Sequence, residues 1–212
     1  TFGIRISLLV AISVTALAVV IGTLIGLIAG YVRGSVDSLI SLIIDFVWGF
    51  PLILVAVLMA ASIGSGLVPV ILAVALVNTV AIARVVRGEV LGISEKEFVA
   101  ASKAGGYSTL RILTRHIAPN VIPVALVLSS YYIAVAIIAE AALSFVGMGA
   151  QPPLPSLGQM VSEGRNYMRL NHWESTIPGI IIFFMVLSVS LVGDGLRDLL
   201  DPRLRTALDR TS

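Results

Sequence analysis

The sequence predicts an all-α, polytopic membrane protein: a bundle of apolar helices that cross a bilayer. Of its 212 residues, 58% are hydrophobic and 12% are charged, about half the charged share of an ordinary soluble domain. Its uncharged stretches reach the length of about 20 residues that a helix needs to cross the hydrocarbon core. They do not alternate between apolar and polar residues, as the strands of a membrane barrel do. Helix is favoured because each helical segment satisfies its own backbone in lipid.

Five segments are predicted to span the membrane, and each is a mostly uncharged run near the required length. In the second, Asp45 is the one charge, and Pro51 is expected to kink or reset the helix. Gly64-Ser65-Gly66 supplies a turn before the third. The five spans are residues 6–30, 38–63, 67–83, 121–142 and 175–193.

Charge placement predicts which side each connection occupies. Residues 84–120 are rich in Lys and Arg, which places them in the cytoplasm by the positive-inside rule. Two spans later the basic tail from residue 197 is also expected in the cytoplasm. The connection at residues 144–174 is then extracytoplasmic, and its prolines make part of it rigid and non-helical.

Counting spans back from the cytoplasmic connection also predicts on which side the chain starts. It places Thr1 outside, and the chain does not begin with Met. We therefore expect one further span upstream and six in the complete protein. Residues 1–212 are expected to form a single transmembrane domain.

Motifs for catalysis and metal binding are missing from the sequence. It has no cysteine, and Lys96 and Lys103 do not follow glycine, so no phosphate-binding GxxxxGK[ST] loop exists. HExxH and GxSxG are also absent. His116 and His172 fall on opposite sides of the predicted membrane, so they cannot share a metal or a catalytic site. We expect no enzyme activity, metal or cofactor in this chain, and its net charge of +2 gives no sign of nucleic-acid binding.

Three glycines and two acids stand out within the spans. Gly22, Gly26 and Gly30 share one helical face, which permits close packing of helices within the chain or between subunits. Asp45 lies about two turns inside its span. It either lines a pathway or, if the segment enters along the membrane–water interface, remains in contact with water. Glu140 lies near the outer surface, where it either snorkels or caps, or lines the pathway. Neither acid has an obvious basic partner in the spans.

The cytoplasmic connection contains a predicted surface helix. Ser94 is the expected N-cap, with Glu97 as its capping-box partner, and the helix stops at Gly105-Gly106. A second helix is expected to begin at Ser108. Small side chains dominate residues 100–106, a surface suited to a groove on another protein. The alternative is a solvated basic loop that only sets topology.

The order of residues in this connection resembles a known family. The pattern resembles the coupling ("EAA") loop of ABC importer permeases, and more narrowly the peptide/nickel branch of binding-protein-dependent importers. The family's Glu-Ala-Ala falls on residues 100–102, so its glutamate is absent here. The residues that carry this likeness are Phe98, Val99, Ala101, Gly106, Arg111, Ile112, Arg115, His116, Ile117, Pro119 and Asn120.

Two further blocks extend the likeness. Residues 140–149 (EAALSFVGMG) with the Pro-rich segment after them are similar to the second, C-type permease subunit of dipeptide and oligopeptide importers. Residues 193–198 (GDGLRD), followed by residues 200–205, are similar as well.

This resemblance implies a type I importer permease fold with six spans, in a prokaryotic cytoplasmic (inner) membrane. It implies half of a translocation pathway for di- or oligopeptides. The partners would be a B-type permease, two ATPase subunits that bind ATP and Mg²⁺, an extracytoplasmic binding protein and membrane lipid. Nickel chelate or glutathione remains an alternative cargo. A stand-alone secondary transporter or channel that uses Asp45 and Glu140 is the alternative of another class, although no convincing internal repeat supports it.

The resemblance also implies roles for particular residues. Those expected to couple to the ATPase are Glu97, Phe98, Ala100, Ala101, Ser102, Gly106, Arg111, Arg115 and Pro119. Arg111 and Arg115 could instead pair with lipid phosphates. Those expected to receive the binding protein are Gln151, Pro152, Pro153 and Pro155.

Overall fold

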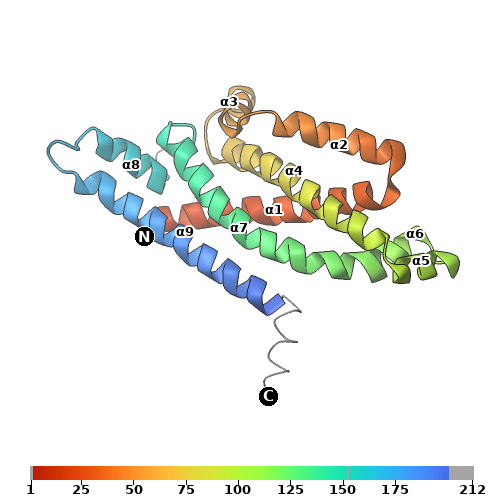
Figure 1. Cartoon of the computed structure of the whole chain (residues 1–212). Coiled ribbons are helices and arrows are strands. Elements are labelled where there is room, and N and C mark those ends of the chain that lie inside the picture. The colour runs from red at the N-terminus through yellow and green to blue at the C-terminus, as the bar shows by residue number, and fades with distance from the viewer. Residues whose placement is uncertain (1, 152, 201–212) are drawn as a thin grey trace, which may run out of the picture.

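The computed structural model describes residues 2–151 and 153–200, and in these ranges the chain folds into helices without strands (Figure 1). Four long helices are apolar enough to cross a membrane. They are α1 (Phe2–Val32), α4 (Leu67–Ser94), the run that ends in α7 (Ala118–Phe145), and α9 (Trp173–Leu200). The shorter elements are α2 (Gly34–Trp48), α3 (Leu52–Ile63), α5 (Glu97–Ala104), α6 (Thr109–Ile112), the π-helix η1 (Leu113–Ile117) and α8 (Leu157–Arg165).

The second predicted span is wrong as a single helix. It consists of α2 and α3, which meet at an angle of 91°. Their junction, residues 49–51, is called the elbow below. Pro51 has no N–H to continue the helix and stands as the N-cap of α3, as its effect on helices predicts. The other four predicted spans are confirmed as helices.

The first part of the predicted cytoplasmic connection, residues 84–94, is helical. Helix α4 continues for a further eleven residues, to Ser94. Val86, Val90 and Ile93 bury their side chains on the side of α4 that packs against α1. Arg84 and Arg87 form ion pairs with α2. Burial and pairing therefore hold this charged stretch in a helix, a tertiary effect that charge counting does not see.

The glycine face of α1 packs against α4. A Cβ atom at Gly22 would lie 2.7 Å from the Thr79 carbonyl oxygen, and one at Gly26 would lie 2.6 Å from Val86 Cγ1. At Gly30 it would lie 2.7 Å from Val90 Cβ. The glycines thus allow two helices of one chain to approach closely, as small residues do in membrane bundles. The packing is intramolecular, which was one of the two alternatives.

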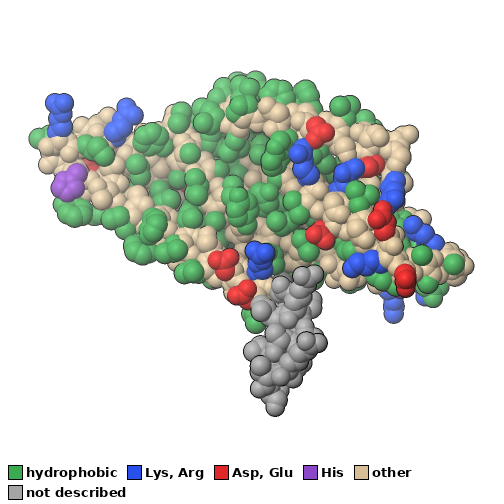
Figure 2. All heavy atoms as spheres, in the orientation of Figure 1, with side chains coloured by type: hydrophobic (Ala, Val, Ile, Leu, Met, Phe, Trp, Pro, Cys, Tyr) green, Lys and Arg blue, Asp and Glu red, His purple; other side chains and the backbone are tan. Residues whose placement is uncertain are grey.

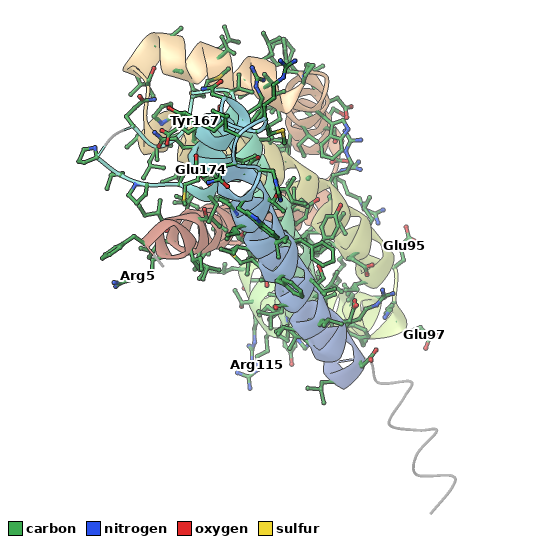
Figure 3. The ribbon with its side chains drawn as sticks, turned by 90° about the vertical axis from the view of Figure 1, so that its left-hand side faces the viewer. Arg5, Glu95, Glu97, Arg115, Tyr167 and Glu174 are labelled. Atoms are coloured by element: carbon green, nitrogen blue, oxygen red, sulfur yellow. The ribbon has the colours of Figure 1, made fainter. Side chains whose placement is uncertain are left out.

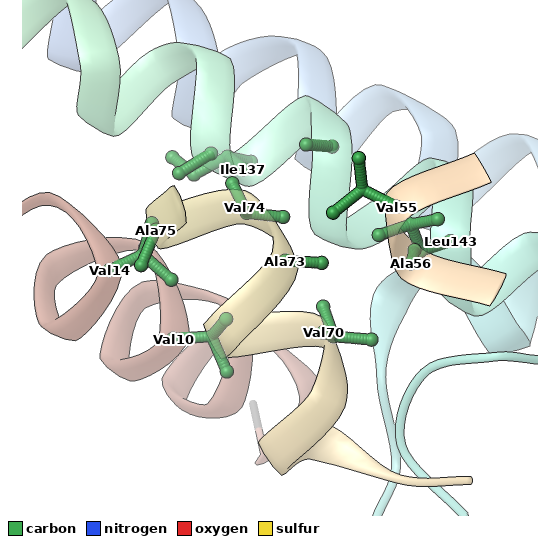
Figure 4. Packing of buried hydrophobic residues seen from close by; sticks show 13 residues of the cluster. Val10, Val14, Val55, Ala56, Val70, Ala73, Val74, Ala75, Ile137 and Leu143 are labelled. Carbon is green, nitrogen blue, oxygen red and sulfur yellow. The ribbon is translucent and has the colours of Figure 1, made fainter. Parts of the chain in front are cut away.

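A second contact region lies at the α3 end of this pair. Buried side chains from α1, α3, α4 and α7 meet there (Figure 4). The labelled members are Val10, Val14, Val55, Ala56, Val70, Ala73, Val74, Ala75, Ile137 and Leu143. Because these side chains, Leu143 excepted, are small or β-branched, four helices pack around one another at short range.

The outer surface is apolar in its middle and charged at one end. Figure 2 shows hydrophobic side chains over the centre, and acidic and basic side chains gathered where α4, α5 and α6 meet. We call this the hairpin end, and the opposite end, which carries α8, the α8 end. Large apolar side chains such as Leu9 and Phe183 are more than half exposed. An apolar surface of this extent suits a membrane environment.

Candidate functional site

The connection between α4 and α7 forms a projecting hairpin, residues 95–117, which contains α5, α6 and η1 (Figure 1). Its inner side is anchored, because Val99, Ile112 and Ile117 are fully buried in one cluster with the end of α4. Its outer side is exposed. Figure 3 shows Glu95, Glu97 and Arg115 directed away from the bundle. The hairpin is thus a helical projection on an apolar base, not a solvated loop without structure.

The end of α5 is capped as the paired glycines predict. Gly106 has a φ of +74°, and its N–H donates to the Lys103 carbonyl, 3.1 Å away. The Tyr107 N–H donates to the Ser102 carbonyl at 3.2 Å. These two bonds form the Schellman arrangement, in which glycine occupies the left-handed position.

The predicted start of α5 is wrong. Ser94 is the last residue of α4, and Lys96 is the N-cap of α5, without a side-chain capping bond. The capping-box pattern failed because α4 extends into the segment that was assigned to a loop. The second helix begins after Ser108, as predicted, although the Ser108 side chain makes no capping bond.

Two stacking contacts fix the basic side of the hairpin. The Arg111 guanidinium lies 4.4 Å from the centre of the Tyr107 ring. The Tyr107 and His116 rings are nearly parallel, with centres 6.1 Å apart. Such contacts hold a cation in place without an acidic partner. Neither contact was foreseen, since the residues are separated by four and nine positions and only the fold brings them together.

Further contacts join the hairpin to the end of α1. Arg33 forms a 3.2 Å ion pair with Glu95, and the Lys103 ammonium lies 5.2 Å from the centre of the Tyr31 ring. Exposed ion pairs contribute little stability. Their effect here is geometric, because they keep the turn after α1 beside the hairpin.

Eight of the nine residues expected to couple to the ATPase lie on the exposed surface of the hairpin or at the start of α7. Ser102 is the exception: it is buried, and its hydroxyl donates to the Phe98 carbonyl within α5 at 2.8 Å. The exposed ones are Glu97, Phe98, Ala100, Ala101, Gly106, Arg111, Arg115 and Pro119.

Asp45 has a basic partner, which corrects the expectation that it has none. The Arg84 Nη2 atom lies 2.5 Å from Asp45 Oδ1, and one turn further along α4, Arg87 binds both carboxylate oxygens of Asp37 at 2.5 and 2.7 Å. Both pairs join α2 to α4. Asp45, Arg84 and Arg87 line a cavity of about 390 Å³ together with Ser41 and Ile44. The partner was missed because Arg84 had been assigned to the loop.

Glu140 is fully buried, so the snorkelling or capping prediction is wrong. It lies near the α8 end of α7, as its place in the sequence indicates, but its carboxylate faces inward. The Ser7 and Ser144 hydroxyls each donate a hydrogen bond to it at 2.7 Å. Nor does it line an open pathway in this chain. The signal that sequence reasoning overlooked is Ser144, one turn after Glu140.

The Pro-rich segment before α8 is exposed and non-helical, as predicted. Gln151, Pro153 and Pro155 are exposed, and Pro152 lies outside the described residues. Ser156 follows as the N-cap of α8, and its side chain accepts a bond from the Gln159 N–H at 3.1 Å. The exposed segment therefore runs directly into a well-capped helix.

The fold and the hairpin together define a multi-pass helical membrane protein with an exposed helical projection at one end. Its sequence identifies the family: residues 22–206 match the binding-protein-dependent transport system inner membrane component. The chain belongs to this family of membrane permeases.

Relatives in sequence carry transport names. A Brucella suis protein, provisionally named a peptide transport system permease, is 44% identical over 156 residues, which are 74% of this chain and 53% of that protein. The dipeptide transport system permease DppC of Alkalihalophilus pseudofirmus is 40% identical over 157 residues, 74% of this chain and 52% of its own length. The glutathione transport system permease GsiD of Escherichia coli is 42% identical over 74% of this chain and 52% of its own length. The chain therefore spans about half the length of these relatives.

Solved structures share the fold of this chain. A chain of the MetNI methionine ABC transporter, in an inward-facing conformation, matches with a TM-score of 0.72 and 20% identity. The match covers 94% of this chain and 96% of that one. A chain of an amino acid ABC transporter matches with a TM-score of 0.59 over 88% of this chain and 89% of its own. The fold is thus that of a type I importer permease, as the sequence predicts.

Proposed function

We propose that the protein containing this chain is a permease subunit of an ATP-driven peptide importer and forms half of its translocation pathway. The observation that carries the proposal is the exposed helix α5, held on a rigid apolar base in a chain of this family. The hairpin end is then cytoplasmic and the α8 end extracytoplasmic, in a prokaryotic inner membrane, and α9 runs toward a cytoplasmic C-terminus.

The partners follow from the geometry and the family. Helix α5 exposes Ala100 and Ala101, so a groove on an ATPase subunit can approach its backbone closely. Two such ATPases bind ATP and Mg²⁺, and this chain itself is non-catalytic. A B-type permease completes the pathway, and an extracytoplasmic binding protein delivers the cargo. Arg111 and Arg115 offer cations to acids of the ATPase or to lipid phosphates.

Motion of α5 reaches the bundle through defined contacts. Val99 and Ile112 seat the hairpin against α4, and Glu95 and Lys103 join it to the end of α1. Closure of the ATPase pair displaces the hairpin as a body, and α1, α4 and α7 tilt with it. The pathway then changes its open side, a two-state change biased by ATP.

Peptides are the proposed cargo because relatives above 40% identity are named for peptide or glutathione transport. Glutathione is itself a short peptide, and it remains the second candidate. Nickel chelate is less well supported, since this chain offers His172 alone at the α8 end. The exposed segment of Gln151, Pro153 and Pro155 is the proposed landing site of the binding protein, and its prolines reduce the ordering cost of docking.

The test begins with assembly. The full-length protein is co-expressed with its neighbouring gene products, and the intact complex is weighed by native mass spectrometry. We expect this permease with a second permease and two ATPases. Isolation of a lone chain or a homo-oligomer would favour a stand-alone secondary transporter or channel.

Uptake of labelled dipeptide by the reconstituted complex then tests the cargo, with glutathione as the competing substrate.

A matched pair of variants tests the role of α5. Ala101→Trp adds bulk to the exposed side of α5, and Asn166→Trp adds the same bulk at the exposed end of α8. We expect the first to lose the ATPase subunits and the second to retain them, with both inserted in the membrane. Retention of the ATPases by Ala101→Trp would exclude this surface as the docking site.

A further inference from the structure

The elbow between α2 and α3 interrupts a segment that, taken as one, is long and apolar enough to cross a membrane. Its residues Gly49, Phe50 and Pro51 are all exposed on this chain. In the described part of the chain, no hydrogen bond is donated to the carbonyl of Gly49 or Phe50. Lipid cannot satisfy such groups, so a break of this kind occurs only against protein or water. The face that carries the elbow is therefore not a lipid face.

A polar cavity lies between α4 and the part of α2 that precedes the elbow. It has a volume of about 390 Å³ and is lined by Ser41, Ile44, Asp45, Arg84 and Arg87. Arg84 lies ten residues before the end of α4 and Asp45 eleven after the start of α2, or about 15 Å inside the hairpin end. The charges thus lie well within the helices that cross the membrane, where ionisable residues mark functional positions.

The two ion pairs between α2 and α4 differ in a way that separates their roles. Arg87 donates to both carboxylate oxygens of Asp37, and the two side chains are 30% and 16% exposed. Arg84 meets Asp45 through one nitrogen and one oxygen, and these side chains are 45% and 69% exposed. The first pair is closed and fastens α2 to α4. The second is open and keeps donors and acceptor atoms free for another molecule.

A nearby ring prepares Arg84 for a planar partner. Its guanidinium lies 5.1 Å from the centre of the Trp48 ring, so one face is covered while its N–H edge stays accessible. Such an edge binds a carboxylate through two parallel bonds. A covering subunit would strip water from Asp45 and Arg84 at a large desolvation cost, so water is the better neighbour for this open pair.

We infer that this cavity is a transient peptide site on the translocation pathway: Arg84 receives the terminal carboxylate and Asp45 the terminal ammonium. A free peptide carries this same pair of opposite charges, so it can replace the internal ion pair without leaving a charge unpaired. The inference rests on the proposed function and adds the residues and the part of the substrate that they recognise.

Direct binding can be measured through Trp48. The chain has two tryptophans, so Trp173→Phe leaves Trp48 as the one reporter in this chain, and the partner subunits' tryptophans are removed or subtracted as background. The probe is alanyl-alanine, titrated into the purified full-length importer after its uptake of peptide has been verified. We expect a saturable change in Trp48 emission. Alanyl-alanine amide and N-acetyl-alanyl-alanine, each lacking one terminal charge, should bind about tenfold more weakly because each loses its charge-assisted hydrogen bonds to Arg84 or to Asp45.

The decisive readout is the coupling between each residue and its end of the peptide. If Arg84 meets the carboxylate, Arg84→Gln weakens binding of the free dipeptide but does not weaken the amide further. Asp45→Asn should behave in the same way toward the N-acetyl peptide. Arg165→Gln is the control: it removes a positive charge at the end of α8, away from the residues that line the cavity, and should leave the discrimination between free and blocked peptides intact.

Three outcomes would overturn the inference. In the first, substituting a residue and blocking the peptide end that faces it weaken binding by additive amounts. The second is equal binding of free and blocked peptides, and the third is no saturable Trp48 response in an importer that takes up peptide. Because two independent substitutions probe the site, failure of one variant to fold leaves the other decisive. An assembly that forms without peptide uptake would instead overturn the proposed function.

Discussion

Ser7 on α1 donates a 2.7 Å hydrogen bond to the carboxylate of Glu140 on α7, and this bond joins residues 133 positions apart. Ser144 supplies a second donor to the same carboxylate. Gly149 then passes so close to Ser144 that a Cβ atom there would overlap its hydroxyl. The block of residues 140–149 thus folds around its own glutamate, and its role is to hold the α8 end of the bundle together.

Ser7→Ala should lower stability. The substitution leaves one oxygen of the buried Glu140 carboxyl group without its donor, and an unpaired buried polar group costs about 1–3 kcal/mol. Thermal unfolding in detergent, followed by tryptophan fluorescence, measures the effect. Ser188→Ala is the matched control, because Ser188 is exposed and donates only within α9, to Phe184. Equal melting temperatures for the two variants would show that the Ser7 bond is dispensable.

Gly26→Ala should separate α1 from α4. The added methyl group would lie 2.6 Å from Val86 Cγ1 and 2.8 Å from the Ala83 carbonyl oxygen, and overpacking of this kind costs about 1–3 kcal/mol. Gly88→Ala provides the contrast, since no atom of the described residues lies within 4 Å of its Cβ position. That change should stabilise α4 by up to about 1 kcal/mol. The prediction fails if Gly26→Ala melts at or above the temperature of Gly88→Ala.

Gly106 should be sensitive to substitution through its backbone. Alanine at a φ of +74° costs about 1–2 kcal/mol, which loosens the cap of α5 and weakens ATPase binding. Gly105→Ala is the control, because Gly105 has a φ of −74°. Gly106→Trp adds bulk to the same strain, so we expect loss of ATPase association with normal membrane insertion. Full transport by Gly106→Trp would count against docking at this hairpin.

The Pro-rich segment should be required for the response to the binding protein. Replacing residues 151–155 by a Gly-Ser linker of equal length keeps Ser156 as the cap of α8. We expect basal ATP hydrolysis to remain and its stimulation by the loaded binding protein to disappear. Asn166→Trp serves as the control on the same end of the molecule. Unchanged stimulation after the replacement would move the docking site elsewhere.

Much of the fold could be predicted because the bilayer imposes a strong pattern. Uncharged runs located four long helices, and Pro51 and Gly106 marked a break and a cap through their own backbone chemistry. The errors arose where tertiary contacts override local signals. Arg84 reads as a loop residue by its charge, yet Asp45 and the packing of α4 on α1 hold it in a helix.

In the candidate site too, features set by local sequence could be predicted, and features set by tertiary contacts could not. Exposure of the hairpin residues followed from composition and a family pattern, since polar and small residues favour a surface. The inward direction of Glu140 and Ser102 could not be predicted, because the face that a helical residue occupies depends on where the neighbouring helix lies. Likewise, the pairing of Arg84 with Asp45 depends on a fold that brings α2 back along α4.

The π-helix η1 joins α6 and α7 into one run of 37 residues, Thr109–Phe145. At 1.5 Å per residue it is a rod about 55 Å long. Such a rod works as a lever: a tilt of about 10° around its midpoint displaces each tip by about 5 Å, roughly one helical pitch. In the proposed importer, a small displacement of the hairpin is therefore carried along this run to Ser144 and the segment that follows it. The wide turn of η1 and Pro123 within α7 mark the two places where this run is most easily bent.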